Sequence, residues 1–250
     1  MFRPLWIEIK LGNLRKNLSL VRRYVGESVK ILATVKQNAY GHGLIRIAKE
    51  LDNLGVNFFG VGSLEEAIAL REAGIKKPIL VLTALLPSTI KLLIKYRVRP
   101  TVVDLAFARR LDKEAKRLAK KVDIHIKVDT GMGRLGVWWE DAKKFICKVC
   151  NLKNLYVEGL FTHFSSADTD YSFTTFQIKS FNALIKECAK EGIFFKYLHS
   201  ANSIALIKYK SSHFNLVRPG LILYGINPYS KMNIELVPLL SLKSKVIFLK

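Results

Sequence analysis

Lys36 occupies a position where a lysine could carry out covalent chemistry. It ends an apolar run that begins at Val29, and it precedes Tyr40 and the segment Gly41-His42-Gly43. A lysine at the mouth of a buried strand is desolvated, which lowers its pKa and makes the neutral amine available. A neutral amine can form a Schiff base with a carbonyl cofactor. A solvated surface lysine is the competing interpretation, so the rest of the chain must decide between the two.

Other chemically capable side chains follow later predicted strands in the same way. They are Lys127, Asp129 and Arg134 after the fifth strand, His163 after the sixth, His199, Asn202 and Ser203 after the seventh, and Arg218, Pro219 and Gly220 after the eighth. Barrel enzymes place their active sites at the carboxyl ends of the strands. We therefore expect these side chains to meet Lys36 at one rim.

Part of this set suits a phosphate group. Phosphate sites in barrels favour the loops after the last two strands, where backbone amides face the anion. Ser203 and the amides of Gly220 and Leu221 would fill that role, and Tyr40 could add a phenolic donor. Each residue also has a structural explanation: a helix cap for Ser203, a turn for Gly220, a core residue for His199.

The elements that would position these residues alternate along the chain. Strands are expected at 29–36, 58–63, 78–83, 100–104, 122–129, 155–164, 197–202 and 216–224. Helices are expected at 44–54, 64–73, 88–96, 105–120, 140–149 and 174–191, with a short one after Ser203. Eight units with nearly continuous apolar strands predict an α/β fold, a closed (β/α)₈ TIM barrel. An open doubly wound sheet is the alternative, but its glycine-rich dinucleotide turn is absent.

The two ends of the chain do not follow this alternation of strands and helices. Residues 5–9 alternate like a short strand, and Asn13 is expected to cap a helix at 14–24. Residues 227–230 resemble a linker, and 236–249 alternate like an antiparallel strand. We predict a strand at 1–10 that packs with a β domain, a barrel at 11–227, and at 228–250 a linker and the first strand of an incomplete C-terminal β domain. The pattern identifies no partner strand for 236–248.

The excess of positive charge suggests nucleic acid as a partner, but the distribution of the charged residues argues against nucleic-acid binding. Lysine and arginine number 41 and aspartate and glutamate 20, giving a formal charge of +21 in 250 residues. The lysines are scattered over predicted helix surfaces, and no dense basic run is interleaved with aromatics. We therefore expect neither a nucleic acid nor a membrane as partner; charge alone keeps a nucleic-acid-binding module as an alternative.

The cysteines and apolar segments indicate a cytoplasmic protein. Cys147 and Cys150 form a C-x-x-C inside a predicted helix, and no second ligand pair accompanies them, so no metal site is expected. Three cysteines that form no disulfide framework are typical of a protein in a reducing compartment. No apolar run approaches the ~20 residues of a membrane span, and Glu8 and Lys10 interrupt any signal-peptide core.

Five segments resemble, in order and spacing, the motifs of bacterial alanine racemase, a fold-type III enzyme that depends on pyridoxal 5′-phosphate (PLP). They are TVKQNAYGHG, KVDTGMGRLG, THFSSAD, HSANSIAL and VRPGLILYG. The resemblance runs from about Leu5 to Val246. It implies an N-terminal PLP-binding barrel, a C-terminal β domain, and interconversion of L-alanine and D-alanine for cell-wall precursors.

The resemblance also implies a role for each matching residue. Lys36 would hold PLP as a Schiff base and act as the base on one face of the substrate, the face from which D-alanine loses its proton. The remaining implied contacts are Tyr40, Ser203, Gly220, Leu221 and neighbouring Asn202 at the phosphate, His163 near the ring, Arg218 at the pyridine nitrogen, and Arg134 at the phenolic oxygen and substrate carboxylate. The lysine that matches Lys127 is often carbamylated and positions the arginine that matches Arg134. An arginine does not release its proton, so Arg218 would keep the ring nitrogen unprotonated and restrain side reactions.

One implied group is missing from the sequence. Racemisation needs acid–base groups on both faces of the α-carbon. In the family the second is a tyrosine in a GYxDG-like motif of the C-terminal domain of the partner subunit in a homodimer, and that motif is absent here. The chain is then expected to be the N-terminal part of a longer racemase or a truncated gene product, or a barrel without full turnover. A barrel-only PLP-binding protein with a homeostatic role is the alternative function.

Overall fold

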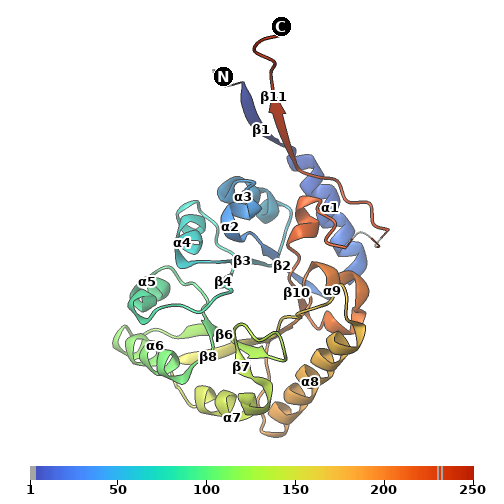
Figure 1. The fold of residues 1–250 in the computed structure, drawn as a ribbon. Coiled ribbons are helices and arrows are strands. Elements are labelled where there is room, and N and C mark those ends of the chain that lie inside the picture. The colour runs from blue at the N-terminus through green and yellow to red at the C-terminus, as the bar shows by residue number, and fades with distance from the viewer. Residues whose placement is uncertain (1–3, 230, 232) are drawn as a thin grey trace.

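The computed structural model describes residues 4–229, 231 and 233–250. Within residues 4–229, eight parallel strands form the barrel: β2 (Lys30–Thr34), β3 (Phe58–Val61), β4 (Ile79–Val81), β5 (Thr101–Val102), β6 (Val122–Asp129), β8 (Leu155–Phe161), β9 (Tyr197–His199) and β10 (Leu216–Val217). The helices are α1 (Leu11–Val25), α3 (Leu44–Asn53), α4 (Leu64–Glu72), α5 (Ile90–Lys95), α6 (Leu105–Arg117), α7 (Trp139–Cys150), α8 (Tyr171–Lys190) and α9 (Ser203–Lys208). The element labelled α2 (Lys36–Tyr40) is a single turn whose backbone angles are not those of a right-handed helix. The helices surround the ring of strands (Figure 1).

Hydrogen bonds at two joints close the ring. The strands pair in the orders β10-β2-β3-β4 and β5-β6-β8-β9. At the first joint, the amide of Val81 donates to the carbonyl of Arg99 over 3.0 Å. At the second, the amide of Arg218 donates to the carbonyl of Ala201 over 2.9 Å. The predicted (β/α)₈ barrel is confirmed.

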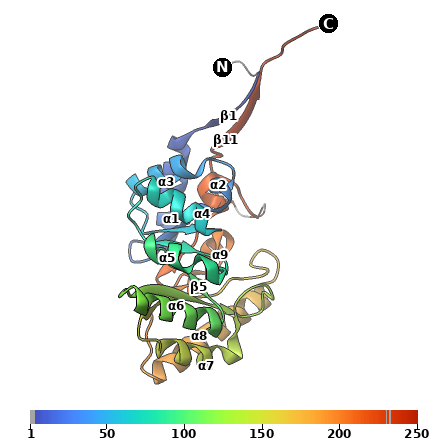
Figure 2. The same cartoon turned by 90° about the vertical axis from the view of Figure 1, so that its left-hand side faces the viewer.

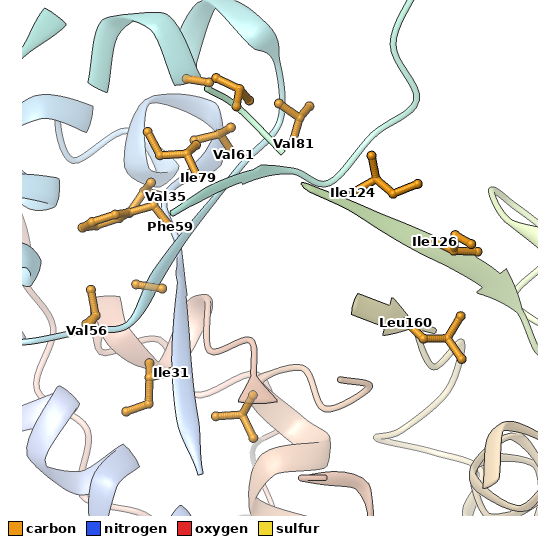
Figure 3. Packing of buried hydrophobic residues seen from close by; sticks show 14 of the residues in the cluster. Ile31, Val35, Val56, Phe59, Val61, Ile79, Val81, Ile124, Ile126 and Leu160 are labelled. Atoms are coloured by element: carbon orange, nitrogen blue, oxygen red, sulfur yellow. The ribbon is translucent and has the colours of Figure 1, made fainter. Parts of the chain in front are cut away.

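Alternating side chains of the strands build two apolar shells. One set, which includes Ile31, Phe59, Ile79 and Ile124, packs between the strands and the surrounding helices (Figure 3). The other set is smaller and fills the barrel interior: Leu32, Phe58, Leu80, Tyr197 and Leu216. Strands buried on both faces carry the nearly continuous apolar runs seen in the sequence.

Several strands end earlier than the sequence pattern predicts. The first strand, β2, stops at Thr34, before Lys36. β8 stops at Phe161, and the guanidinium of Arg218 donates a hydrogen bond to the next carbonyl, that of Thr162, over 2.8 Å. The eighth was predicted to reach residue 224 but has only the two residues of β10. Pro219 lacks an amide hydrogen and Gly220 has ψ −95°, so the strand cannot continue, and a 3₁₀ turn, η3 (Leu221–Tyr224), follows. Two further 3₁₀ turns are η1 (Pro87–Thr89) and η2 (Lys210–Ser212), and β7 (Val137–Trp138) pairs with β6.

The two ends of the chain form a ribbon that projects from the barrel (Figure 2). β1 (Leu5–Ile9) pairs antiparallel with β11 (Leu240–Ser244), from Leu5 opposite Ser244 to Ile9 opposite Leu240. The expectation that residues 236–248 have no partner in the chain was therefore wrong. The division of the chain into domains at residues 10 and 227 stays a prediction.

α1 begins before the predicted cap. Lys10 is its N-cap, and the side-chain amide of Asn13 donates instead to the carbonyl of Pro238 over 2.8 Å. The buried Asn17 continues this connection, donating to the carbonyls of Leu223 (3.1 Å) and Val237 (2.9 Å). The segment that leads to β11 is thus hydrogen-bonded to α1.

Two negative observations apply to the described part of the chain. None of its helices is both long and apolar enough to cross a membrane. Its histidine, cysteine and carboxylate side chains form no group of three that could hold a metal ion. Cys147 and Cys150 are free thiols on α7, as the helical pattern predicted.

Candidate active site

Directly after β2, the chain around Lys36 turns in a left-handed sense. Residues 37–40 are not glycines, yet all have φ between 53° and 55°. Such dihedral angles cost about 1–2 kcal/mol for each residue. Four in succession persist only where the surrounding structure holds them. The sequence pattern gave no sign of this turn.

Hydrogen bonds to fixed neighbours hold the turn. The amide of Ala39 donates to the carbonyl of Val35 (2.8 Å) and the amide of Asn38 to Oε1 of Glu66 on α4 (2.9 Å). Oδ1 of Asn38 in turn accepts from the amide of Leu44, the first residue of α3 (2.8 Å). The turn is therefore fastened to two helices, and Lys36 at its start has a fixed backbone.

The electrostatic surroundings of Lys36 favour its neutral form. Burial lowers the pKa of its amine, and the positive charges of Arg134 and Arg218 lower it further, while Glu66 acts in the opposite direction. A lower pKa leaves more unprotonated amine near neutral pH. This is the condition for an amine that attacks a carbonyl group.

Polar groups from three segments form a corner beside Lys36. The amide of Gly220 donates to Oγ of Ser203 over 3.0 Å. A Cβ on residue 220 would lie 2.8 Å from the Tyr40 hydroxyl, so glycine is needed for this close approach. Asn202, not Ser203, caps α9, because its Oδ1 accepts from two amides of the first turn. Hydroxyl groups and the start of η3 at Leu221 thus converge on one small region.

Lys127 and Arg134 come from β6 and the loop that follows it. Oδ1 of Asp129 accepts from the amides of residues 131, 132 and 133 at 2.8–3.2 Å, which shapes the loop that carries Arg134. Burial lowers the pKa of Lys127 to about 8, with contributions from Arg218 and Arg134. Arg134 is exposed, whereas only 4% of Lys127 is accessible.

Arg218 is held rigidly by its neighbours. Its guanidinium donates to Nδ1 of His199 (2.9 Å), to the carbonyl of Ser200 (3.0 Å) and to Nδ1 of His163 (3.2 Å), besides the carbonyl of Thr162. Burial lowers the pKa of Arg218 to about 9, which leaves it protonated at neutral pH. The pKa of His163 is held well below its usual value by burial and then by Arg218 and other cations, so His163 is neutral.

Arg218 begins an interior chain that runs through the barrel: Arg218, His199, His125 and Glu158. Nε2 of His199 lies 2.9 Å from Nδ1 of His125, and Nε2 of His125 lies 3.5 Å from a carboxylate oxygen of Glu158. Both histidines are fully buried, and Glu158 is 2% exposed. His199 therefore lies in the barrel interior and not at the rim where the sequence suggested it.

Local backbone geometry brings this interior chain together. The register of β6 and β8 shifts between Ile124 and His125, so that His125 faces Gly159 and Glu158 becomes the extra residue of a bulge. A bulge re-aims a side chain, here that of Glu158 into the protein. A Cβ on Gly159 would lie 2.4 Å from the ring of His125, so only glycine leaves room for the ring.

Only one arrangement of protons is compatible with the hydrogen bonds of the interior chain. An arginine is only a donor, so Nδ1 of His199 must be an acceptor and its proton lies on Nε2. His199 is neutral, because burial and then Arg218 hold its pKa well below the usual value. His199 then donates to His125, whose remaining proton points at Glu158. The hydrogen-bonded order ends at His125, because its Nε2 has no hydrogen-bond partner among the described residues and only a longer contact with the carboxylate of Glu158.

One cavity of about 450 Å³ collects the ten residues to which the family resemblance assigns a role, but not Asp129 or His199, which were also expected at this rim. The ten residues are Lys36, Tyr40, Lys127, Arg134, His163, Asn202, Ser203, Arg218, Gly220 and Leu221. The volume lies within the usual ~300–1,000 Å³ of small-molecule pockets. The carboxyl ends of the strands thus meet as the barrel fold requires.

Other cavity-lining residues were not predicted. Leu82 and Thr83 follow β4, Phe161 ends β8, and Leu135 follows Arg134. Thr83 could have been noticed as a polar residue at the end of a strand. Phe161 could not, because an aromatic residue in an apolar run is typical of any buried strand; here its ring stacks on His199 with centroids 4.6 Å apart.

The residues of the cavity fit PLP. A half-buried amine with a lowered pKa is available for an aldehyde, and the hydroxyls of Tyr40 and Ser203 both lie against Gly220, where a phosphate could bind. Four cations line the cavity (Lys36, Lys127, Arg134 and Arg218), which suits a ligand with several negative groups. The fold and this cavity define a class of barrel enzymes in which a lysine binds a phosphorylated carbonyl cofactor.

Comparison with known proteins narrows this class. The family described as alanine racemase, N-terminal domain, matches residues 9–228. Alanine racemase of Carboxydothermus hydrogenoformans is 42% identical over 248 residues, covering 98% of this chain and 67% of that protein. The enzyme of Halothermothrix orenii is 43% identical over 251 residues, covering 99% of this chain and 66% of its own length. The solved alanine racemase of Clostridium difficile 630 superposes with a TM-score of 0.97 at 34% identity, covering 100% of this chain and 70% of that one.

The chain therefore belongs to the alanine racemase family, whose members are PLP-dependent isomerases. It spans about two thirds of the length of the curated relatives that it matches.

Proposed function

We propose that this chain provides the PLP-binding half of an active site that interconverts L-alanine and D-alanine. The observation that carries the proposal is the half-buried amine of Lys36, with its lowered pKa, in a cavity lined by three further cations and a hydroxyl corner. The relatives that match nearly the whole chain are racemases, which favours this function over a barrel that only stores PLP.

In the proposed reaction, PLP supplies an electron-withdrawing ring that acidifies the α-proton of the bound amino acid. Lys36 would hold the cofactor until the amine of the substrate replaces it, and the freed neutral amine would then take or return that proton on its own face. The planar fork of Arg134 is suited to the substrate carboxylate. We assign Arg218 to the ring nitrogen, where its bonds to His199 and to the carbonyl of Ser200 would hold the guanidinium in place as a hydrogen-bond donor.

The proposed two-base mechanism predicts unequal behaviour of the two alanine enantiomers. We expect the PLP-loaded chain to exchange the α-proton of D-alanine for deuterium in heavy water faster than that of L-alanine, by roughly 10²-fold or more, the usual contribution of one positioned base. Proton NMR of each enantiomer measures this. Lys36→Ala serves as the control that removes the base. Equal, rapid exchange from both enantiomers would show a second base within these 250 residues and contradict the half-site.

We propose that Lys127 is carbamylated. Its pKa of about 8 provides neutral amine that can react with carbon dioxide near that pH, and a negative carbamate would offset Arg218 and Arg134, which lower that pKa. In isotope-labelled bicarbonate at pH 8, NMR should show one carbamate signal that weakens towards pH 6, where the amine is protonated. Lys127→Gln should lose the signal and Lys121→Gln, on the surface, should keep it. A signal unaffected by Lys127→Gln would place the carbamate elsewhere.

The wider assignments rest on the family resemblance. We propose that the active enzyme is a cytoplasmic homodimer when a C-terminal β domain completes it, and that D-alanine is supplied to peptidoglycan precursors. Residues 228–250, with β11, would begin that domain, and β1 would pack with it. A bacterium that requires D-alanine should grow without it only when the chain is expressed with such a domain. Failure of that complete form to support growth would count against these assignments.

A further inference from the structure

A second, larger cavity lies at the opposite end of the barrel from Lys36. It has a volume of about 1,280 Å³ and is lined by the segments that lead from α4 to β4, from α5 to β5 and from α6 to β6. These segments precede the strands, so the cavity opens at the amino-terminal ends of β4, β5 and β6. We call it the floor cavity.

The floor cavity is strongly basic. Its lining includes nine lysine and arginine side chains and, among the described residues, a single carboxylate, that of Asp123. Asp123 is already paired with Arg99 over 2.9 Å. Six exposed cations line the cavity without a salt bridge to any described carboxylate: Lys76, Lys91, Lys95, Arg97, Lys120 and Lys121.

A partly buried arginine fixes the shape of the floor cavity. Arg71 on α4 donates to the carbonyls of Ile75 and Lys77 (both 2.7 Å) in its own loop, and to those of Tyr96 (3.0 Å) and Arg97 (3.2 Å) in the next. These acceptors are neutral, so they cross-link two loops without cancelling the charge of Arg71. The basic groups therefore stand on a preformed framework, which reduces the ordering that binding must impose.

The arrangement has an electrostatic cost in the absence of an anion. Like charges around one concavity repel, and low-dielectric walls focus their field. The lining includes the half-buried side chains of Tyr96 and Leu118, and Ile75, Leu93 and Val98 are buried behind it. A concave site with apolar walls fits a compact ligand better than an extended strand, which needs a basic groove or stripe.

We propose that the floor cavity binds a compact polyanion of the linear oligophosphate class, either free or as the phosphate chain of a nucleoside triphosphate. Several linked phosphates would meet the six dispersed cations at once, which a single phosphate cannot do. The accessible surfaces of Tyr96 and Leu118 would accept a nucleoside where one is attached. The site is separate from the Lys36 cavity and does not depend on its proposed function.

Calorimetric titration of the PLP-loaded protein with inorganic tripolyphosphate tests this proposal. Bound PLP keeps the titrant out of the Lys36 cavity. The floor variant is Lys120→Gln/Lys121→Gln, which removes two cavity charges. Its matched control is Lys113→Gln/Lys116→Gln, which removes two exposed charges from α6 outside the cavity. We expect the floor variant to bind about tenfold more weakly or worse and the control to bind within about twofold of the parent protein, because charge interactions fall with distance and screening.

Each further result decides one part of the proposal. Adenosine triphosphate that binds as well as tripolyphosphate would indicate recognition of the phosphate chain, and tighter binding would place the nucleoside on the apolar walls; both support the site. Equal losses in the two double variants, or no binding by the parent, would overturn it. A single-stranded oligonucleotide that binds far more tightly than tripolyphosphate, and through Lys120 and Lys121, would replace the oligophosphate with nucleic acid.

Discussion

Replacement of Lys36 by alanine is expected to abolish the covalent adduct that borohydride traps between this protein and PLP. The parent protein should yield one reduced adduct per chain on the peptide that contains Lys36. The physical reason is that this amine combines a lowered pKa with a backbone held by the left-handed turn. Mass spectrometry of the digested protein locates the adduct, and the loss should be complete because no other atom of residue 36 can replace the nitrogen.

Lys127 is the lysine with which the reactivity of Lys36 should be compared in this experiment. Its amine also lies in the cavity, with a pKa lowered to about 8. If reactivity depended on pKa alone, PLP would be trapped there in Lys36→Ala. An adduct of equal yield on Lys127 or another lysine would contradict the assignment of Lys36. Circular dichroism of the variant must match that of the parent, so that the loss is not a loss of fold.

The second large effect concerns stability and lies away from the cofactor. Glu158→Gln is expected to lower the free energy of unfolding by about 3 kcal/mol, the usual result of removing one partner from a buried ion pair. Glu158 contacts Arg99, lies 3.5 Å from both Lys196 and His125, and is 2% exposed. Urea denaturation at pH 7 measures the change. Glu114→Gln, which breaks the exposed pair with Arg117, is the matched control and should change stability little.

The same carboxylate predicts a pH dependence. Burial raises the pKa of Glu158, but its interactions with His125 and Arg99 outweigh burial and lower the pKa from 4.5 to about 2. A pKa lowered by folding stabilises the protein above the unfolded value and loses that effect as pH falls. The parent should therefore lose stability between pH 4.5 and 2, and Glu158→Gln should lose less over that interval. Parallel pH profiles for the two proteins would contradict this assignment.

The barrel and ten of the residues that line its cavity were predicted from the sequence for a physical reason, although His199 was also expected at the rim and lies in the interior. Parallel strands buried on both faces must be apolar along their length, so the polar residue that ends each one is conspicuous. Lys36, Lys127 and Arg218 were visible in this way, and the barrel brings strand ends together whatever the lengths of the helices. The chemical role of each residue came from the family motifs, because a pattern of apolar residues carries no information about chemistry.

The features that were not predicted depend on contacts between distant parts of the chain. Asn38 enters a left-handed conformation because Glu66 and Leu44 bind its backbone and side chain, and nothing in the local sequence reveals that. The bulge at Glu158 is a matter of strand register, which is set between β6 and β8. The pairing of β1 with β11 joins segments from the two ends of the chain, so periodicity within either one cannot identify its partner.

The closure of the barrel has a consequence for how the protein is made. β2 pairs with β10, with Lys30 opposite Leu216. One edge of β2, the first barrel strand, is therefore unpaired until β10, the last, has been synthesised. During synthesis, at about 5–20 residues per second, the interval between these strands lasts roughly 10–40 seconds. Throughout it, the open edge of β2 is available to other chains. A chaperone that shields nascent β2 would therefore raise the yield of folded protein more than one that acts after release from the ribosome.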